Sequence, residues 1–271
     1  MVPRDSFEIG PVRVRAGRKQ ALALPITRLV TGADVDLPIR VVHGRHEGPT
    51  VWIDAAIHGD EAVGVEVVRQ VLADLDAKKL RGTLIAVPIV NVLGFMNGDR
   101  YLPDRRDLNR SFPGSRRGSL AARIAHLMMT EVVAKCEVGI DLHTGSDRRT
   151  NLPQIRADLE DERTRELSIA FGAPVMMHAR LRDGSLRAAA REAGAKVLLY
   201  EAGEAWRMDG WAVDAGVRGV RRVLAHLGMI DPPEEDPPTP TLESWRSGWV
   251  RARGTGMLHL EAELGQRLAK G

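Results

Sequence analysis

Short apolar runs alternate with amphipathic segments along most of this chain. Six of the runs have the length of β-strands and are nearly continuous, a pattern that favours strands covered on both faces. They lie at residues 39–42, 51–57, 83–89, 138–142, 174–177 and 196–200. The chain is therefore expected to build a central sheet that is mainly parallel or mixed.

The segments between these runs have the spacing of amphipathic helices. The clearest begins near Asp60 and continues to Lys79, with apolar residues at every third or fourth position and Gly82 as the expected stop. Further helices are expected at residues 119–134, 158–171, 185–193 and 211–227. Strands that alternate with helices in this way predict an α/β fold in which helices flank the sheet.

A proline-rich segment marks a predicted boundary near the C-terminus. Residues 231–240 read Asp-Pro-Pro-Glu-Glu-Asp-Pro-Pro-Thr-Pro, and the prolines exclude a helix and predict a semi-rigid linker. The linker would separate a large domain at residues 1–230 from a small tail at residues 241–271. Aromatic residues and the turn Gly254-Thr-Gly256 predict that the tail forms a small β module.

Four residues with metal-site chemistry follow three of the apolar runs. His58 and Glu61 follow the second run, His143 follows the fourth and Glu201 follows the sixth. Ligands of open α/β sheets bind beyond the carboxyl ends of the strands, so these side chains are expected at one rim. Two imidazoles and one carboxylate suit a catalytic zinc, which keeps one position for water and needs a separate base. The pattern predicts Glu201 as that base.

The three candidate metal ligands also have simpler interpretations. Glu61 stands where the start of a helix favours an acidic side chain, and His58 can be an ordinary loop histidine. A histidine such as His143, after an apolar run, is often a hydrogen-bonded core residue. The metal hypothesis therefore depends on the convergence of three distant segments.

Composition excludes several other classes of protein. The 271 residues include 39 Lys and Arg against 36 Asp and Glu, a formal excess of +3, and the cations are scattered. Nucleic-acid binding is not expected, because it requires a basic face. The single cysteine, Cys136, excludes an internal disulfide and a cysteine-based zinc site. The charged start lacks a signal peptide's apolar stretch, and no run approaches the ~20 residues that span a bilayer, so we expect a cytoplasmic protein without membrane contact.

Four motifs together carry a resemblance to a known family. They are His58-Gly-Asp-Glu61, Asp107-Leu-Asn109-Arg110, Asp141-Leu-His143-Thr-Gly and Glu201-Ala-Gly. In this order, over about residues 39–203, they resemble the succinylglutamate desuccinylase/aspartoacylase family, a deacylase branch of the zinc carboxypeptidase-like fold. The resemblance implies one Zn²⁺ per chain, bound by His58, Glu61 and His143, with Glu201 as general acid and base.

The resemblance also implies a substrate-binding segment. Asn109 and Arg110 would hold the carboxylate of a small-molecule substrate, and a guanidinium suits this because it forms two parallel hydrogen bonds. Asp107 would accept a hydrogen bond from the free ring nitrogen of a zinc histidine. The alternative is a surface turn closed by Pro113-Gly114 with solvated arginines.

The residue that polarises the scissile carbonyl is less sharply indicated. In related deacylases an arginine shortly before the Asp-x-Asn-Arg element has this role, and Arg100 stands in that place, although Arg105 and Arg106 compete for it. Arg148 and Arg149, after the zinc histidine, would either meet an acidic acyl group or face water.

The predicted function is zinc-dependent hydrolysis of the amide bond of a small N-acyl amino acid or related N-acyl amine. Zinc would lower the pKa of its water to about 7, and Glu201 would take the proton. A metallocarboxypeptidase acting on short peptides is an alternative, because it also cleaves an amide beside a carboxylate. A more remote alternative is a binding protein that holds a metal ion but catalyses no reaction. The sequence makes no prediction of oligomeric state.

The tail carries a resemblance of its own. Trp249-Val-Arg-Ala-Arg-Gly-Thr-Gly256 and Leu264-Gly-Gln-Arg-Leu-Ala-Lys-Gly271 resemble the start of the C-terminal β module of bacterial relatives, which normally continues further. The module would then be short or cut off, and by resemblance it would flank the mouth of the active site. A plain packing appendage is the alternative.

Overall fold

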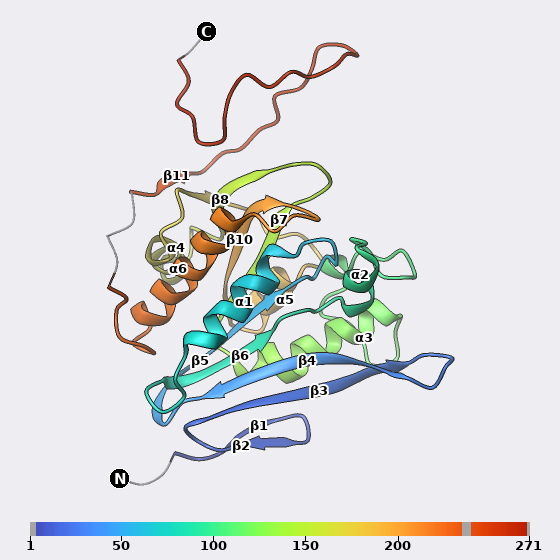
Figure 1. Ribbon diagram of the computed structural model, residues 1–271, viewed down its shortest axis with the longest axis vertical. Coiled ribbons are helices and arrows are strands. Elements are labelled where there is room, and N and C mark those ends of the chain that lie inside the picture. The colour runs from blue at the N-terminus through green and yellow to red at the C-terminus, as the bar shows by residue number, and fades with distance from the viewer. Residues whose placement is uncertain (1–3, 235–239, 270–271) are drawn as a thin grey trace.

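The computed structural model describes residues 4–234 and 240–269. A nine-stranded sheet in the order β11-β9-β8-β10-β7-β5-β6-β4-β3 runs through this part of the chain (Figure 1). Its strands are β3 (Arg18–Arg28), β4 (Asp34–His43), β5 (His46–Ala55), β6 (Arg81–Val87), β7 (Val138–Gly145), β8 (Asn151–Ala157), β9 (Val175–His178), β10 (Lys196–Glu204) and β11 (Leu242–Ser244). A small hairpin of β1 (Phe7–Ile9) and β2 (Val12–Val14) forms a separate two-stranded sheet, which packs beside β3.

The centre of the sheet is parallel and its flanks are mixed. β6, β5, β7 and β10 run parallel to one another, whereas β8 is antiparallel to β10 and the pair β4 and β3 continues the sheet in antiparallel fashion. All six predicted strands form, and the predicted mixed, mainly parallel sheet is confirmed. β3 and β8 were not predicted. β3 buries only alternate residues, and β8 is interrupted by polar side chains, so neither contains a continuous apolar run.

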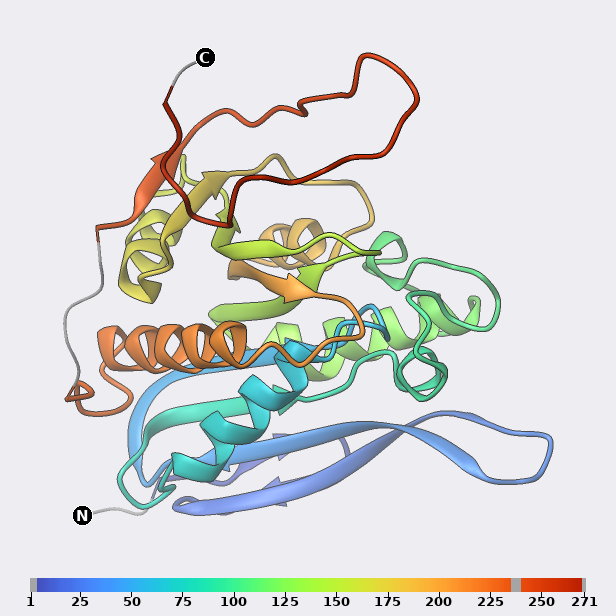
Figure 2. The same cartoon turned by 45° about the horizontal axis from the view of Figure 1, so that its top comes forward.

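Helices cover both faces of the sheet, as Figure 2 shows. One face packs against α1 (Val63–Asp74), α4 (Glu162–Phe171) and α6 (Gly210–His226). The other packs against α3 (Leu120–Leu127) and α5 (Leu186–Glu192). All five predicted helices are present, and α3 continues as a π-helical turn, Met128–Val132, and a 3-10 turn, Val133–Lys135. The short helices α2 (Val92–Asn97) and η1 (Leu108–Arg110) were not predicted.

The tail differs from the expectation. β11 pairs in parallel with β9 at the edge of the main sheet, and residues 245–269 contain no helix or strand. Within the described residues the tail therefore forms no sheet of its own. Its apolar side chains, such as Trp249 at 73% exposure, have no partner face to cover them, and a two- or three-stranded unit needs such a face for stability. Residues 235–239 of the predicted linker lie outside the described residues, and the division into domains stays a prediction.

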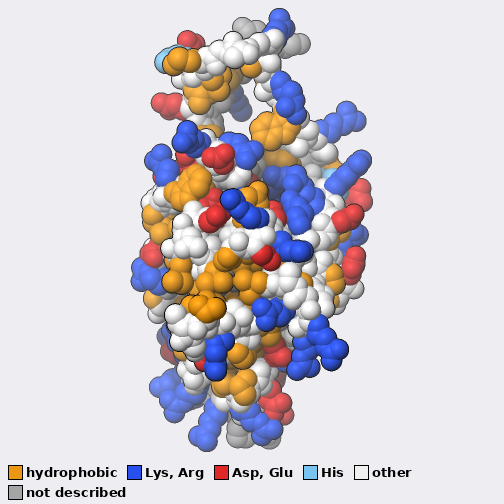
Figure 3. Space-filling view, turned by 90° about the vertical axis from the view of Figure 1, so that its right-hand side faces the viewer, with side chains coloured by type: hydrophobic (Ala, Val, Ile, Leu, Met, Phe, Trp, Pro, Cys, Tyr) orange, Lys and Arg blue, Asp and Glu red, His pale blue; other side chains and the backbone are white. Residues whose placement is uncertain are grey.

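The described ranges contain no helix that combines the length and the apolar character needed to cross a bilayer. Figure 3 shows the side of the molecule that carries α2, where basic side chains are interspersed with acidic and apolar ones.

Candidate metal centre

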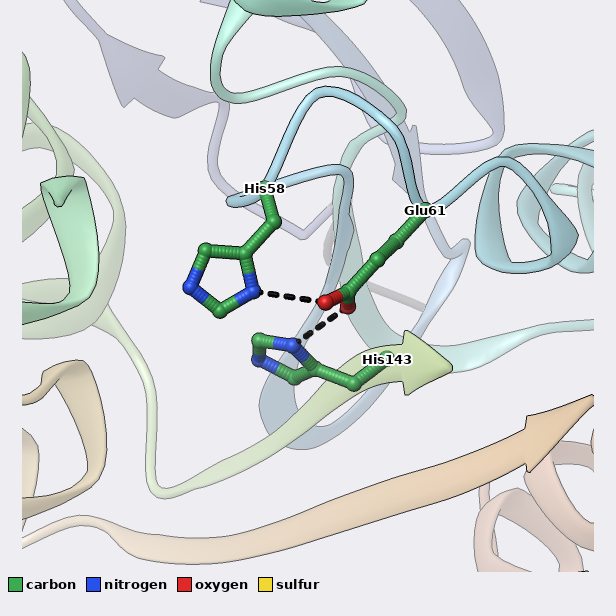
Figure 4. A group of neighbouring side chains, drawn as sticks. All are labelled: His58, Glu61 and His143. Carbon is green, nitrogen blue, oxygen red and sulfur yellow. Dashed lines mark hydrogen bonds and ion pairs between the residues drawn. The ribbon is translucent and has the colours of Figure 1, made fainter. Parts of the chain in front are cut away.

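His58, Glu61 and His143 converge at the carboxyl ends of β5 and β7. His58 and Glu61 lie in the connection from β5 to α1, and His143 lies on β7. One possible ligand atom from each residue falls within 4.8 Å of the others (Figure 4). The three residues are between 2% and 4% exposed. The structure thus brings together the three residues that the sequence identified as metal ligands.

The turn that carries two of these ligands requires a glycine. Gly59 lies directly against the backbone of α2, and a Cβ at this position would come within 2.1 Å of the carbonyl carbon of Gly94. The same turn is closed by a hydrogen bond from the Glu61 backbone N–H to the His58 carbonyl at 3.1 Å. This close approach explains the glycine of the His-Gly-Asp-Glu motif.

The Glu61 carboxylate lies between the two imidazoles. Its Oε1 is 2.8 Å from His58 Nδ1 and its Oε2 is 2.7 Å from His143 Nδ1, as the dashed lines in Figure 4 mark. The backbone N–H of Thr144 also donates to Oε2 at 3.1 Å. The Nδ1 atoms therefore face the common centre, and the Nε2 atoms point away from it.

Each outward nitrogen meets a carboxylate. His58 Nε2 lies 3.2 Å from Asp107 Oδ1, and His143 Nε2 lies 2.9 Å from Asp141 Oδ1, although off the axis of a regular hydrogen bond. Metal-binding histidines typically have such partners, which fix the ring and its tautomer. The structure thus places Asp107 beside the histidine with which the sequence paired it, and its role there stays a prediction. Asp141 was not assigned a role, although it faces the same side of a strand as His143 two residues later.

The charges of the centre are strongly coupled. Burial alone would raise the pKa of Glu61, but the two histidines hold it well below its usual value. Burial would lower the pKa of both histidines, yet Glu61 and the outer carboxylates raise it, and they do so strongly for His143. A site that stabilises positive charge between two imidazoles and a carboxylate has the donor set for a divalent cation. The residues present therefore fit a single metal ion.

Arg100 reaches the same centre. Its guanidinium donates to Glu61 Oε1 at 3.1 Å, and its second terminal nitrogen lies 2.8 Å from His58 Nε2. Arg105 and Arg106 are exposed on the surface instead, and Arg106 lies 3.4 Å from Asp104. Of the three arginines considered for the scissile carbonyl, the structure places Arg100 at the centre.

Trp206 joins the loop of Arg100 to the loop of the metal ligands. Its backbone N–H donates to the Asp60 carbonyl at 2.8 Å, and its indole N–H donates to the Gly98 carbonyl at 2.6 Å. Trp206 has a φ of +59°, a left-handed conformation that is unfavourable for a bulky residue. The two hydrogen bonds hold it in this conformation. The sequence offered no signal for this residue.

The segment that the sequence predicts to bind substrate lies beside the centre. Asp107 begins η1 and its Oδ1 accepts from the Asn109 backbone N–H at 2.9 Å. Asn109 is buried, and its side-chain oxygen accepts from the Leu186 N–H at 2.9 Å, which leaves the amide NH₂ as the donor for another group. Arg110 is exposed and donates to the Asn109 carbonyl. Burial would raise the pKa of Asp107, but His58, Arg100 and Arg110 lower it to about 2.

Glu201 lies next to the metal ligands across the sheet. Its Cα pairs with that of His143 in the parallel ladder between β10 and β7. Asn151 Nδ2 donates to Oε2 at 2.5 Å, and Arg156 approaches Oε1 at 3.5 Å. Burial raises the pKa of Glu201, with Arg156 and His143 acting against it. Asn151 and Arg156 were missed because β8 was not predicted.

The loop after His143 contains the two arginines of uncertain role. Arg149 donates to the Ser146 carbonyl at 2.9 Å and to its hydroxyl at 2.5 Å. Arg148 has a φ of +58°, and both side chains are exposed. Arg149 therefore braces its own loop in this structure.

The comparison with known families decides the assignment. The family model described as the succinylglutamate desuccinylase/aspartoacylase catalytic domain matches residues 47–227. The chain belongs to this family. The resemblance drawn from the four motifs is confirmed, and as a member of the succinylglutamate desuccinylase/aspartoacylase family the protein is a metal-dependent deacylase.

Individual members of the family show how the likeness extends along the chain. An N-alpha-acetyl-L-2,4-diaminobutyric acid deacetylase from Halomonas elongata is 29% identical over 248 residues, which cover 88% of this chain and 72% of the relative. The product-bound structure of the ectoine utilization protein EutE (DoeB) from Ruegeria pomeroyi has a TM-score of 0.77 at 26% identity, over 90% of this chain and 74% of that one. A succinylglutamate desuccinylase/aspartoacylase structure from Rhodobacter sphaeroides has a TM-score of 0.72 at 28% identity. The match covers 84% of this chain and 67% of that one.

Proposed function

We propose that this deacylase binds one zinc ion and hydrolyses the amide bond of a small N-acyl amino acid or a related N-acyl amine. The observation that carries the proposal is the convergence of His58, Glu61 and His143 within 4.8 Å, with Glu201 paired to His143 on the adjacent strand. The likeness to the Halomonas elongata deacetylase supports an N-acetylated diamino acid as the first substrate to test.

Glu201 is the proposed general base and acid. When bound, zinc would supply Lewis acidity, which polarises a carbonyl and lowers the pKa of water. Glu201 would take a proton from the attacking water and return it to the leaving amine. Burial raises the pKa of this carboxyl group, which suits a group that must both accept and donate near neutral pH. Arg100, part-exposed beside Glu61, would donate to the carbonyl oxygen as it gains negative charge.

Asn109 and Arg110 are the proposed holders of the substrate carboxylate. The Asn109 side-chain oxygen already accepts a hydrogen bond from the backbone N–H of Leu186, at the start of α5. This bond fixes the orientation of the side-chain NH₂ group, which remains free to donate to substrate. The exposed guanidinium of Arg110 adds a charge-assisted, two-pronged contact. Held in this way, the substrate would present its amide bond to the centre in one orientation.

The proposal is tested with zinc-loaded protein against a panel of N-acyl amino acids, N-acyl diamines and dipeptides. Release of free amine from N-acyl substrates, with slower cleavage of dipeptides, is the expected result. Preferential cleavage of dipeptides would instead identify a carboxypeptidase. Absence of zinc by elemental analysis, with no activity on zinc addition, would contradict the metal assignment.

Two variants separate metal binding from catalysis. Glu201→Gln is expected to keep zinc and lose at least about a hundredfold in kcat, the usual scale for removal of a general base. His143→Ala is expected to lose zinc together with activity. A Glu201→Gln variant with undiminished turnover would exclude Glu201 from the mechanism.

A further inference from the structure

The Glu201 carboxylate is held by two side chains from one neighbouring strand. β8 runs antiparallel to β10, and Gln154 lies directly opposite Glu201 in the ladder. Asn151, at the start of β8, donates to Oε2 at 2.5 Å. Arg156, near its end, approaches Oε1 at 3.5 Å. The two donors thus reach the same carboxylate from opposite directions along the strand and contact different oxygens.

We propose that Asn151 and Arg156 are positioning residues for Glu201, with Asn151 anchoring Oε2 and Arg156 leaving Oε1 as the oxygen that exchanges the proton. The inference rests on the proposed role of Glu201 as the base. It assigns the strand β8 a part in catalysis through Asn151 and Arg156, which contact Glu201 and not the proposed metal ligands.

The two distances support this division. A bond of 2.5 Å from an amide to a carboxylate is short and directional, whereas a contact of 3.5 Å is at the limit of a hydrogen bond and is easily exchanged. The terminal torsion of a glutamate is broad, so an unanchored carboxylate would sample many orientations. A general base must come within about 2.6–3.2 Å of the proton it takes, and anchoring one oxygen restricts where the other can lie.

The positive charge of Arg156 also affects the pKa of Glu201. Burial raises the pKa of Glu201, and Arg156 is the strongest of the charges that lower it. The other charged groups that act on Glu201 are His143 on β7, and Glu61 and His58 in the connection from β5 to α1. Because Arg156 is about one-third exposed, solvent moderates its effect, and Glu201 remains able to accept a proton.

The experiment compares pH profiles of kcat/KM for zinc-loaded variants. Asn151→Ala is expected to lower kcat by between about tenfold and about a hundredfold, the scale of a misplaced catalytic group, with KM changed by less than about threefold. Arg156→Met is expected to move the acidic limb of the profile to higher pH, because loss of the Arg156 charge raises the pKa of Glu201 further. Arg156→Lys keeps the charge and is expected to leave the limb near its original position.

A matched control comes from a neighbouring contact between the start of the β8 segment and β10. Thr150, the residue just before β8, donates to Glu204 Oε2 on β10 at 2.8 Å, a contact that does not involve Glu201. Thr150→Val is therefore expected to keep both kcat and the pH profile. Thermal unfolding of every variant shows whether a loss of activity is only a loss of folded protein.

The outcomes distinguish this inference from the proposed function. If Glu201→Gln is inactive but Asn151→Ala and Arg156→Met behave as the parent protein, the positioning role is wrong and the function stands. A rise in KM at constant kcat in Arg156→Met would show that Arg156 binds substrate instead. If Glu201→Gln itself is fully active, the proposed function fails first.

Discussion

At the scale of single residues, the chain of contacts behind His143 extends into the core. Trp52 donates its indole N–H to Asp54 Oδ1 at 2.7 Å, and Asp54 lies beside Asp141 in the ladder between β5 and β7. Both carboxyl groups are fully buried. Burial and the negative charge of Asp141 raise the pKa of Asp54 well above its usual value. A protonated Asp54 can donate to Asp141, which in turn faces the ring nitrogen of His143.

This arrangement predicts how the variant Asp54→Asn responds to pH. Because the pKa of Asp54 is higher in the folded than in the unfolded protein, stability is lost as the pH rises from the unfolded pKa, about 3.9, through the folded one. Asparagine keeps an acceptor for Trp52 and a donor for Asp141 but does not titrate. The free energy of unfolding of the variant, relative to the parent, is therefore expected to grow with pH in this window.

Urea unfolding of both proteins at a series of pH values, with chelator present, measures this difference. All other titrating groups are shared, and those that do not interact with Asp54 cancel in the comparison. A difference that stays constant across the series would show that folding does not raise the pKa of Asp54.

At the scale of elements, the contact of α1 with the sheet positions the metal ligands. Gly64, in the first turn of α1, faces Leu142 and Ala55, and a Cβ there would come within 2.7 Å of the Leu142 Cβ. The helix therefore lies directly on β5 and β7, the two strands that lead to His58 and His143.

Gly64→Ala is expected to destabilise the protein by about 1–3 kcal/mol, the usual cost of overpacking a core, and to weaken metal binding because the start of α1 must move. Gly210→Ala is the matched control. Gly210 begins α6 with no atom within 4 Å of an added Cβ, so alanine there should be neutral or stabilise by up to ~1 kcal/mol. Denaturant unfolding and competition with a metal chelator measure the two effects. Equal behaviour of the two variants would contradict the packing argument.

The elements also explain which parts of the molecule the sequence could predict. Strands buried on both faces form continuous apolar runs, and a polar residue just beyond such a run is placed at the rim by the strand itself. His58, His143 and Glu201 are all of this kind. β8 contains no continuous run, so its register beside β10 could not be predicted. Asn151 and Arg156 depend entirely on that register and could not be found from their spacing.

At the scale of the whole molecule, the metal centre ties together parts of the chain that are distant in sequence. Glu61 and His143 are separated by 82 residues and meet at 2.7 Å. A metal that binds only the folded arrangement stabilises it by mass action, about 2.7 kcal/mol when the free metal is a hundredfold above its Kd. Removing the metal with a chelator should therefore lower the melting temperature of the whole catalytic fold.

The size of this metal effect is expected to increase with pH. In the metal-free protein the pKa values of His58 and His143 are raised, so their protonated forms stabilise the fold below the unfolded pKa, and this contribution is lost as the pH rises through the folded values. Metal binding requires the deprotonated imidazoles and thus strengthens over the same window. The difference in melting temperature between zinc-loaded and chelated protein should grow from about pH 6 to about pH 8. His143→Ala should show no such growth, and an increment independent of pH in the parent protein would exclude the histidines as the ligands.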